Sequence, residues 1–202
     1  MTRTRRRRTL SGVRLALLVA VLLVALPAVA SASSPDPKRM VLTLQDMPTG
    51  FKVDTSHYYD VAAASKSTDV SQAQLEKWGY VTGYQTEFSR DVTLSHLLTG
   101  AIDIASSASV YRSETGAEES LALSVDACHK APAQELSVGA KIGDEAHLCS
   151  SAQRSGSYTL QVYAVVWRHG RLKGAVIVAG IKGGVSPTQA VKLAQLASKR
   201  LH

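Results

Sequence analysis

The sequence predicts an α+β fold, in which helices pack on an antiparallel β-sheet of about five strands and a C-terminal helix follows a long β-hairpin. Three observations predict this fold. Two long apolar runs flank the pair His169-Gly170, as the strands of a hairpin do. Two segments with alternating apolar residues precede them, and three segments begin with a helix-capping pattern. Helices that interrupt an antiparallel sheet form a second layer on it.

Residues 1–32 have the pattern of a signal peptide. Six arginines precede the apolar run LALLVAVLLVALPAVA, and the small residues SASS follow it. Pro27 breaks the apolar helix, and both Ala28-Val29-Ala30 and Ala30-Ser31-Ala32 offer the small residues of a cleavage site. We expect cleavage. The alternative is an uncleaved anchor, which would be the protein's one contact with a membrane. Because no cysteine follows the run, a bacterial lipid anchor is excluded.

The basic character of the chain belongs to this first segment. The chain has 23 Lys and Arg against 16 Asp and Glu, a formal charge of +7. Six of the basic residues and none of the acidic ones precede residue 33, which leaves 17 against 16. The exported part is therefore nearly neutral, and we expect neither a nucleic-acid partner nor electrostatic binding to an anionic membrane.

The two cysteines, Cys128 and Cys149, each lie within two positions of a histidine, His129 or His147. This grouping raises two alternatives, a zinc site and a disulfide. Exported proteins meet an oxidising environment, in which two cysteines normally pair. Zinc needs four converging ligands, whereas the side chains of adjacent residues such as Cys128 and His129 diverge on a helix or strand. We therefore predict a disulfide, no metal and two solvated histidines.

Residues 33–70 are predicted to form an N-terminal arm, and residues 71–202 one α+β domain. Within the arm we expect a short helix near Val41 to Gln45 and a turn at Pro48 to Gly50. The stretches SASSPDPK and VAAASKSTDVS are polar and small, so we expect the remainder of the arm to be a loosely ordered link up to residue 70.

The domain begins with a helix and two strands. Ser71 and Gln74 form a capping box at the start of SQAQLEKW, and Gly79 ends that helix. The segments YVTGYQTEFSR and AIDIASSASVYRS then alternate as strands do, and we expect them to pair. The residues that mark this alternation are Tyr80, Tyr84 and Phe88 in the first segment and Ile102, Ile104 and Val110 in the second.

Two further helices are predicted from their caps. The box Thr115-Gly-Ala-Glu118 opens the first, and Cys128 lies just past its end, so the disulfide would tie this helix to IGDEAHLC, which leads into a strand. Ser186 caps the last helix, with Pro187 at its first position and Gln189 closing the box. The apolar stripe of this last helix is Ala190, Leu193, Ala194, Ala197 and Leu201.

The predicted hairpin, SYTLQVYAVVWRHGRLKGAVIVAGI, is apolar on both faces. A two-residue turn at His169-Gly170 pairs Trp167 with Leu172 and Val165 with Gly174. One face contains Leu160, Val162, Ala164, Val166, Ala175, Ile177 and Ala179, and the other contains Tyr163, Val165, Trp167, Leu172, Val176 and Val178.

An antiparallel sheet usually keeps one face polar, so the second apolar face of this hairpin needs a cover. One alternative is that helices or the N-terminal arm cover it as ordinary core. The other is a groove that binds an apolar small molecule or a partner in the cell envelope. The candidate groove residues are Tyr80, Tyr84, Tyr163, Val165, Trp167, Leu172 and Gly174.

No motif of the sequence predicts catalysis or a cofactor. Asp144 and Glu145 are adjacent carboxylates whose side chains point apart on a strand, unlike a working acid/base pair. The glycines of Gly180 to Gly184 match no phosphate-loop spacing, and we interpret this stretch as a turn. The sequence contains neither G-x-S-x-G nor H-E-x-x-H. We therefore expect no catalytic residues, no cofactor and no enzyme activity.

The chain resembles the small secreted α+β proteins of actinobacteria and related high-GC bacteria. It is similar in layout to mycobacterial envelope lipoproteins and to the extracellular sensor domain of the receptor kinase PknH. The stretches that carry the resemblance are DMPTGF, VYRSETGAEES, VGAKIGDEAHLC, VYAVVWRHG and AVKLAQLASKRL. The resemblance implies an exported, non-enzymatic binding or sensor-like module at the cell envelope. The alternatives are a structural envelope protein without a ligand and a secreted hydrolase.

Overall fold

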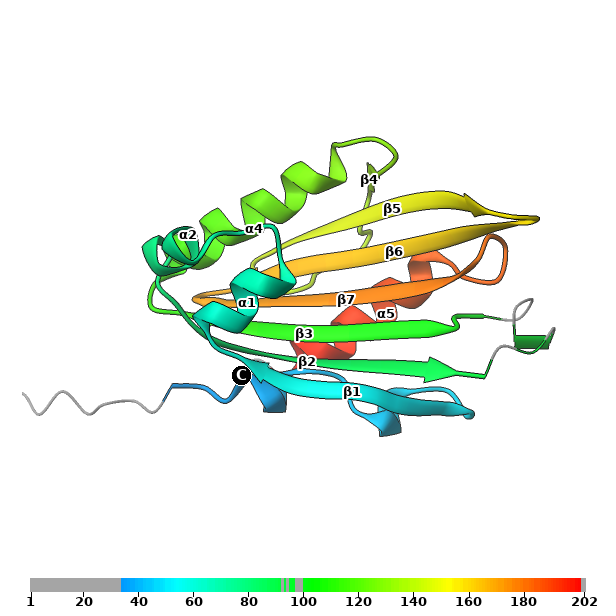
Figure 1. Ribbon diagram of the computed structural model, residues 1–202, viewed down its shortest axis with the longest axis horizontal. Helices are drawn as coiled ribbons and strands as arrows, with labels where there is room; N and C mark the ends of the chain where they lie inside the picture. The colour runs from blue at the N-terminus through cyan, green and yellow to red at the C-terminus, as the bar shows by residue number, and fades with distance from the viewer. Residues whose placement is uncertain (1–33, 92, 94, 97–99, 201–202) are drawn as a thin grey trace, which may run out of the picture. The chain divides into compact units, whose positions relative to one another are not determined.

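Seven β-strands form one antiparallel sheet in the computed structural model, which describes residues 34–91, 93, 95, 96 and 100–200. The strands lie side by side in the order β1-β2-β3-β7-β6-β5-β4 (Figure 1). Their bounds are Phe51–Tyr59 (β1), Tyr80–Arg90 (β2), Asp103–Tyr111 (β3), Gln134–Leu136 (β4), Glu145–Ser155 (β5), Tyr158–His169 (β6) and Leu172–Ile181 (β7).

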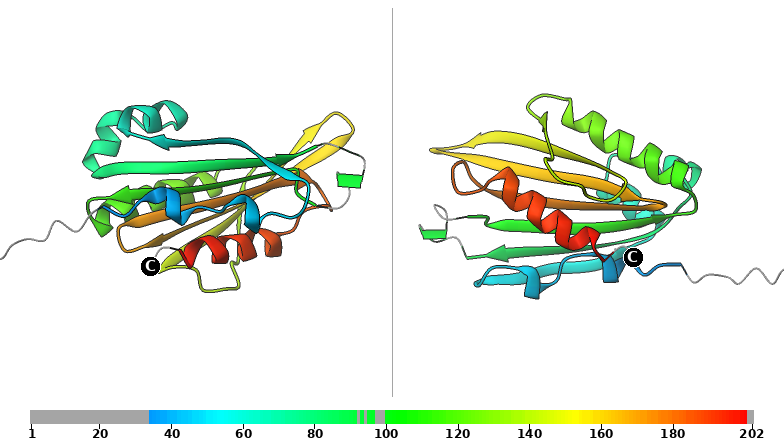
Figure 2. Two further views of the ribbon diagram at one scale, coloured as in Figure 1. Left: turned by 90° about the horizontal axis from the view of Figure 1, so that it is seen from below. Right: turned by 180° about the vertical axis from the view of Figure 1, so that it is seen from behind.

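Helices lie on both faces of this sheet. The short 3₁₀ helices η1 and η2 and the C-terminal helix α5 lie on one face, whereas α1, α2 and α4 lie on the other (Figures 1 and 2). Their bounds are Pro37–Met40 (η1), Leu44–Asp46 (η2), Val61–Ser67 (α1), Gln72–Lys77 (α2), Glu114–Cys128 (α4) and Pro187–Ser198 (α5). The α+β class and the helix after the hairpin are confirmed.

The sheet has two more strands than the sequence predicts, β1 and β4. β1 lies at the edge of the sheet, and only Phe51 at its start is buried. An edge strand with so little buried surface shows no apolar alternation, so residues 51–59 were expected to be loosely ordered. Asp60 then caps α1, accepting a hydrogen bond from the Ala63 amide, where a linker was expected. β4 has three residues, too few to show a period.

The first described residues differ from expectation in a second respect. The helix expected near Val41 to Gln45 is replaced by η1 and η2, which flank the buried residues Val41 and Leu42. The turn at Pro48 to Gly50 is present, and Gly50 has a positive φ of 94°. Residues 1–32, for which a signal peptide is predicted, lie outside the described residues.

The caps of the helices follow the sequence closely. The hydroxyl of Ser71 accepts a hydrogen bond from the Gln74 amide, and that of Ser186 accepts one from the Gln189 amide. Both caps are therefore confirmed. α4, however, begins earlier than predicted, because Ser113 and not Thr115 is its N-cap, and Cys128 is its last residue. Leu201, the last member of the predicted α5 stripe, lies outside the described residues.

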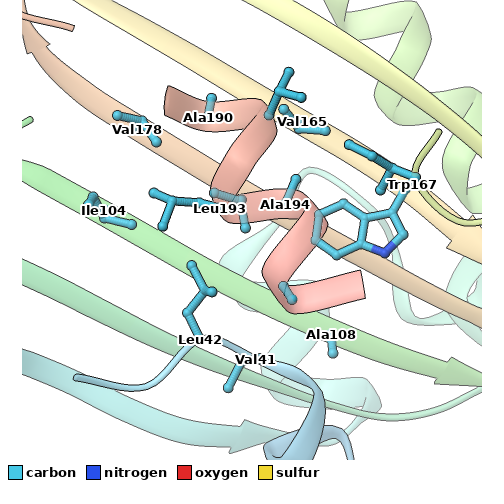
Figure 3. Close-up of a cluster of buried hydrophobic side chains, with 14 of the residues drawn as sticks. Val41, Leu42, Ile104, Ala108, Val165, Trp167, Val178, Ala190, Leu193 and Ala194 are labelled. Carbon is cyan, nitrogen blue, oxygen red and sulfur yellow. The ribbon is translucent and has the colours of Figure 1, made fainter. Parts of the chain in front are cut away.

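The main core lies between the sheet and the layer formed by α5 and residues 37–47. Val165, Trp167 and Val178 of the hairpin face Ala190, Leu193 and Ala194 of α5 (Figure 3). Val41 and Leu42 complete the core, and the Leu42 amide donates to the hydroxyl of the buried Ser106 at 3.1 Å. Arg200 joins the two ends of the chain, because its guanidinium donates to the Val41 carbonyl and to Asp46, each at 2.7 Å.

The β6–β7 hairpin turns one residue later than predicted. Gly170 and Arg171 form the turn, so that His169 pairs with Leu172, Trp167 with Gly174 and Val165 with Val176. Gly170 has φ 52°, and no residue other than glycine has positive φ among the described residues. The predicted turn required positive φ at His169, which the shifted register avoids.

Candidate functional site

The predicted aromatic groove is not formed, because five of its seven residues lie in or against the main core. Val165, Trp167 and Leu172 are buried beneath α5, and Tyr163 packs against the same cluster. Side chains enclosed in this way are not accessible to a ligand. Of the two alternatives for this face of the hairpin, the structure shows the ordinary core, with α5 and residues 37–47 as its cover.

Tyr84 is the fifth of these core residues, and its ring centroid lies 4.7 Å from that of Tyr58. Tyr80 belongs to a second apolar cluster on the opposite face of the sheet. Gly174 lies directly beneath the Trp167 ring, where a Cβ atom would overlap the indole. Trp167 therefore requires glycine as its neighbour across the hairpin.

A groove of about 590 Å³ does occur, on the face opposite α5. We call it the α4 groove; it lies between helices α1, α2 and α4 and strands β2, β3 and β7. Its volume falls within the range of about 300 to 1,000 Å³ that small-molecule sites occupy. Tyr80, Tyr84 and Gly174 are part of its lining, whereas Tyr163, Val165, Trp167 and Leu172 are not. The further aromatic residues of the lining are Tyr59, Trp78 and Tyr111.

The α4 groove has one wall formed by α4 and another formed by α2, Trp78, β2 and β3. On α4, Ser120, Leu123, Ser124 and Ala127 line it, and their spacing of three or four residues places them on one helix face. On the other side, Leu75 and Trp78 pack with Tyr80 and Tyr111 in the second apolar cluster. The end of the groove towards β7 is open to solvent at Ile177, which is 41% exposed. The groove is therefore apolar and accessible.

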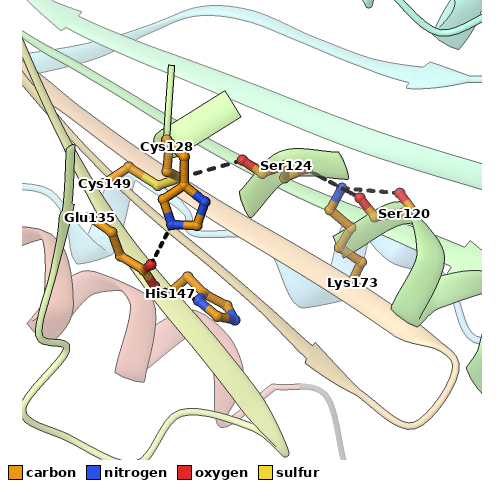
Figure 4. The surroundings of a disulfide bond; sticks show 8 residues. Ser120, Ser124, Cys128, Glu135, His147, Cys149 and Lys173 are labelled. Atoms are coloured by element: carbon orange, nitrogen blue, oxygen red, sulfur yellow. Dashed lines mark hydrogen bonds and ion pairs between the residues drawn. A yellow bond between two sulfur atoms is a disulfide. The ribbon is translucent and has the colours of Figure 1, made fainter. Parts of the chain in front are cut away.

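Lys173 supplies a positive charge to the floor of this groove. It projects from β7 toward α4, and its amine donates to Ser124 Oγ at 2.7 Å, to Ser120 Oγ at 3.0 Å and to the Ser120 carbonyl at 2.9 Å (Figure 4). The Tyr111 hydroxyl also donates to Ser120 Oγ, at 2.6 Å. Because no carboxylate pairs with the amine within the described part of the chain, burial lowers the pKa of Lys173 to about 8.

We expect Lys173→Met to change the free energy of unfolding by less than about 1 kcal/mol at pH 7, because two opposing contributions nearly cancel. A pKa lowered from 10.5 to about 8 corresponds to roughly 3 kcal/mol of unfavourable charge burial, which the variant removes. The variant also loses three hydrogen bonds of about 1 kcal/mol each, which offset nearly all of that gain. Urea unfolding of both proteins measures the difference.

The same prediction has a pH dependence with a definite sign. Because the folded pKa of Lys173 lies below the unfolded one, the unfolded chain binds more protons between about pH 8 and pH 10.5. The free energy of unfolding of the wild type should therefore rise relative to the variant as the pH increases through this window. A difference between the two proteins that is the same at pH 7 and pH 9.5 would contradict the assigned burial of charge.

Sequence reasoning missed Lys173, Ser120 and Ser124, although each left a signal. Lys173 shares a face of β7 with Ala175 and Ile177, so it is a single charge in an otherwise apolar alternation. Ser120 and Ser124 are four residues apart and thus lie one above the other on a helix. Only the pairing of β3 with β7 brings this lysine beneath that helix.

The predicted disulfide between Cys128 and Cys149 is confirmed. It ties the last residue of α4 to β5 (Figure 4). The neighbouring histidines share a carboxylate, because Glu135 contacts His129 Nε2 at 2.8 Å and His147 Nδ1 at 2.6 Å. Both histidines were predicted to be solvated. His129 is exposed, but His147 is only partly exposed.

The electrostatics of this histidine cluster follow from its hydrogen bonds. Burial acts to lower the pKa of His147, but hydrogen bonds with Glu135 and Glu145 outweigh it and raise that pKa above 6.5. Hydrogen bonds from His147 and His129 hold the pKa of Glu135 below its ordinary value. Among the described residues, no group of three or more His, Cys, Asp or Glu side chains has an arrangement that can hold a metal ion.

The adjacent carboxylates Asp144 and Glu145 both lie near Arg168. Asp144 accepts a hydrogen bond from the Gly170 amide at 2.6 Å, which with the nearby His169 and Arg168 lowers the pKa of this carboxyl despite some burial. Glu145 accepts from Arg168 at 3.4 Å. Both therefore support the hairpin turn.

No helix in the described part of the chain is long and apolar enough to span a membrane.

Comparison with known proteins shows a similarity of fold but none of sequence. No protein-family model and no curated protein matches the sequence. The structure is similar to that of the extracellular domain of PknH from Mycobacterium tuberculosis, with a TM-score of 0.55 and 8% sequence identity, over 83% of this chain and 98% of that chain. At this identity the similarity shows the fold alone. The similarity in layout to the extracellular domain of PknH, which the sequence resemblance implies, is thus confirmed at the level of the fold.

Proposed function

We propose that this chain is an extracytoplasmic, non-enzymatic binding module of the bacterial cell envelope, and that it binds an apolar small molecule in the α4 groove. The α4 groove itself is the observation that carries the proposal. It is lined by Leu75, Trp78 and Tyr80 on one side and by Leu123 on the other, and Ile177 lies at its open end. A pocket with mostly apolar walls and a few polar groups is the usual form of a small-molecule site.

Three observations support a location outside the cytoplasm. The first 32 residues have the composition and order of a signal peptide. The Cys128–Cys149 disulfide is of a kind that persists in oxidising compartments. The fold is similar to that of an extracellular domain. An envelope protein would be exposed to lipids and other apolar molecules, which are the class of ligand that the groove walls favour.

Ile177→Glu tests the proposal directly. Ile177 is 41% exposed, so a glutamate there should leave the fold intact while it places a charge in the groove. The probe is the neutral apolar fluorophore N-phenyl-1-naphthylamine, whose emission rises in an apolar site. We expect saturable binding to the wild type and at least tenfold weaker binding to Ile177→Glu.

Val81→Glu is the matched control. Val81 is also a strand residue, 37% exposed, but it is not part of the groove. It should bind the fluorophore as the wild type does. Equal affinity in all three proteins would show that the fluorophore binds elsewhere, and an absence of saturable binding to the wild type would refute an apolar site in this groove.

A further inference from the structure

We propose that the ligand of the α4 groove is a single-chain amphiphile with a carboxylate head group, and that Lys173 holds this head group together with the hydroxyls of Ser120 and Ser124. The inference rests on the proposed function and adds to it the chemical class of the ligand. It follows from the placement of one amine and several hydroxyls at the floor of a groove whose walls are otherwise apolar.

The charges of the groove are unbalanced. The charged residues of its lining are Lys130, Lys173 and Asp69, and of these only Lys173 lies on the sheet beneath α4. Its three hydrogen-bond acceptors are two hydroxyls and a carbonyl, all of them neutral. A buried cation without a carboxylate partner is unfavourable. An anionic ligand would supply the missing charge and would be held by it.

The hydroxyls around Lys173 are suited to an oxyanion. A serine hydroxyl both donates and accepts. The Ser124 hydroxyl accepts from the amine and donates to the Ser120 carbonyl at a long 3.3 Å, so it can turn this proton toward a bound carboxylate while it keeps contact with the amine. Ser120 Oγ already accepts from Lys173 and from Tyr111, which leaves its own proton to donate. Ser107 and Ser109 of β3 line the same groove. One cation and several hydroxyls thus meet at one place.

The apolar walls define the rest of the ligand. Leu123 on α4 and Ile177 on β7 are both exposed, and they extend the apolar lining from Lys173 toward solvent. A hydrocarbon chain would cover these side chains while the head group lies at the amine. A compact anion without a chain would leave them uncovered, and an alcohol of the same chain length would leave the lysine charge unpaired. A long-chain carboxylate satisfies both parts of the groove.

Competition against N-phenyl-1-naphthylamine at pH 7 tests this inference, with dodecanoate, 1-dodecanol and acetate as competitors. We expect dodecanoate to bind the wild type at least tenfold more tightly than dodecanol, and acetate to displace no fluorophore. Lys173→Met should bind both twelve-carbon ligands with about the affinity that the wild type has for dodecanol. Lys182→Met, an exposed lysine near the end of the same strand, is the matched control and should keep the preference for the acid.

The possible outcomes separate the two proposals. If dodecanol and dodecanoate bind the wild type equally, the groove binds apolar ligands but the carboxylate inference is wrong. A preference for the acid that survives Lys173→Met, or displacement by acetate, also overturns it. If the fluorophore binds but neither twelve-carbon ligand displaces it, the inference fails while the proposed function stands. If the fluorophore itself does not bind, both fail. The comparison of the two ligands on the wild type needs no variant, so the test does not depend on the folding of Lys173→Met.

Discussion

Replacing Trp167 by alanine is expected to lower the free energy of unfolding by about 3 to 5 kcal/mol. The side chain is 1% exposed, lies between the sheet and α5, and packs against Gly174 on the neighbouring strand. Alanine would leave a cavity that the surrounding strands cannot close, because the sheet fixes their spacing. Urea unfolding followed by circular dichroism measures the loss without relying on tryptophan fluorescence.

Trp167→Phe is the control for this prediction. Phenylalanine keeps most of the ring, and it removes an indole N–H that has no hydrogen-bond partner among the described residues. We therefore expect a smaller loss of stability than with alanine. If Trp167→Ala instead lost less than about 1 kcal/mol and abolished binding of the apolar fluorophore, the burial of Trp167 would be the wrong explanation of its role.

Removal of the disulfide by the double change Cys128→Ala and Cys149→Ala should cost about 3 kcal/mol. The two cysteines are 21 positions apart, and closing a loop of this length restricts the unfolded chain by about that amount. Both cysteines are buried, so alanine preserves an apolar environment at the end of α4. Because α4 is one wall of the groove, binding of the apolar fluorophore should weaken as well.

The reduced wild type provides a check on this result. Treatment with a reductant should lower the stability of the wild type to that of the double variant and should leave the double variant unchanged. A double variant as stable as the oxidised wild type would mean that packing of α4 on the sheet is sufficient without the cross-link.

Much of the fold could be predicted from local patterns. The helices that follow Ser71 and Ser186 could be predicted, because a capping hydroxyl bonds to an amide only three residues further along the chain. The pattern of alternating apolar residues predicted four strands, because each buries alternate side chains in the core: β2, β3, β6 and β7. β1 could not be recognised in this way. It is held by its pairing with β2 and buries little of its own surface.

The site was harder to predict than the fold. The sequence shows that both faces of the β6–β7 hairpin are apolar, but which face receives α5 depends on strand order, which no local pattern contains. Gly174 illustrates the difficulty. It was expected opposite Val165 as part of the groove, whereas the actual register places it against the Trp167 ring. The groove formed on the other face, where Lys173 becomes significant only once α4 lies above it.

The contact between Arg200 and the segment around Val41 determines when the chain can fold. The two residues are 159 positions apart, and the core that they close contains side chains from both ends of the described chain. Val41 and Leu42 therefore have no lasting partners until the strands and α5 have been made, so the first part of the core cannot form by itself. Such long-range closure slows folding.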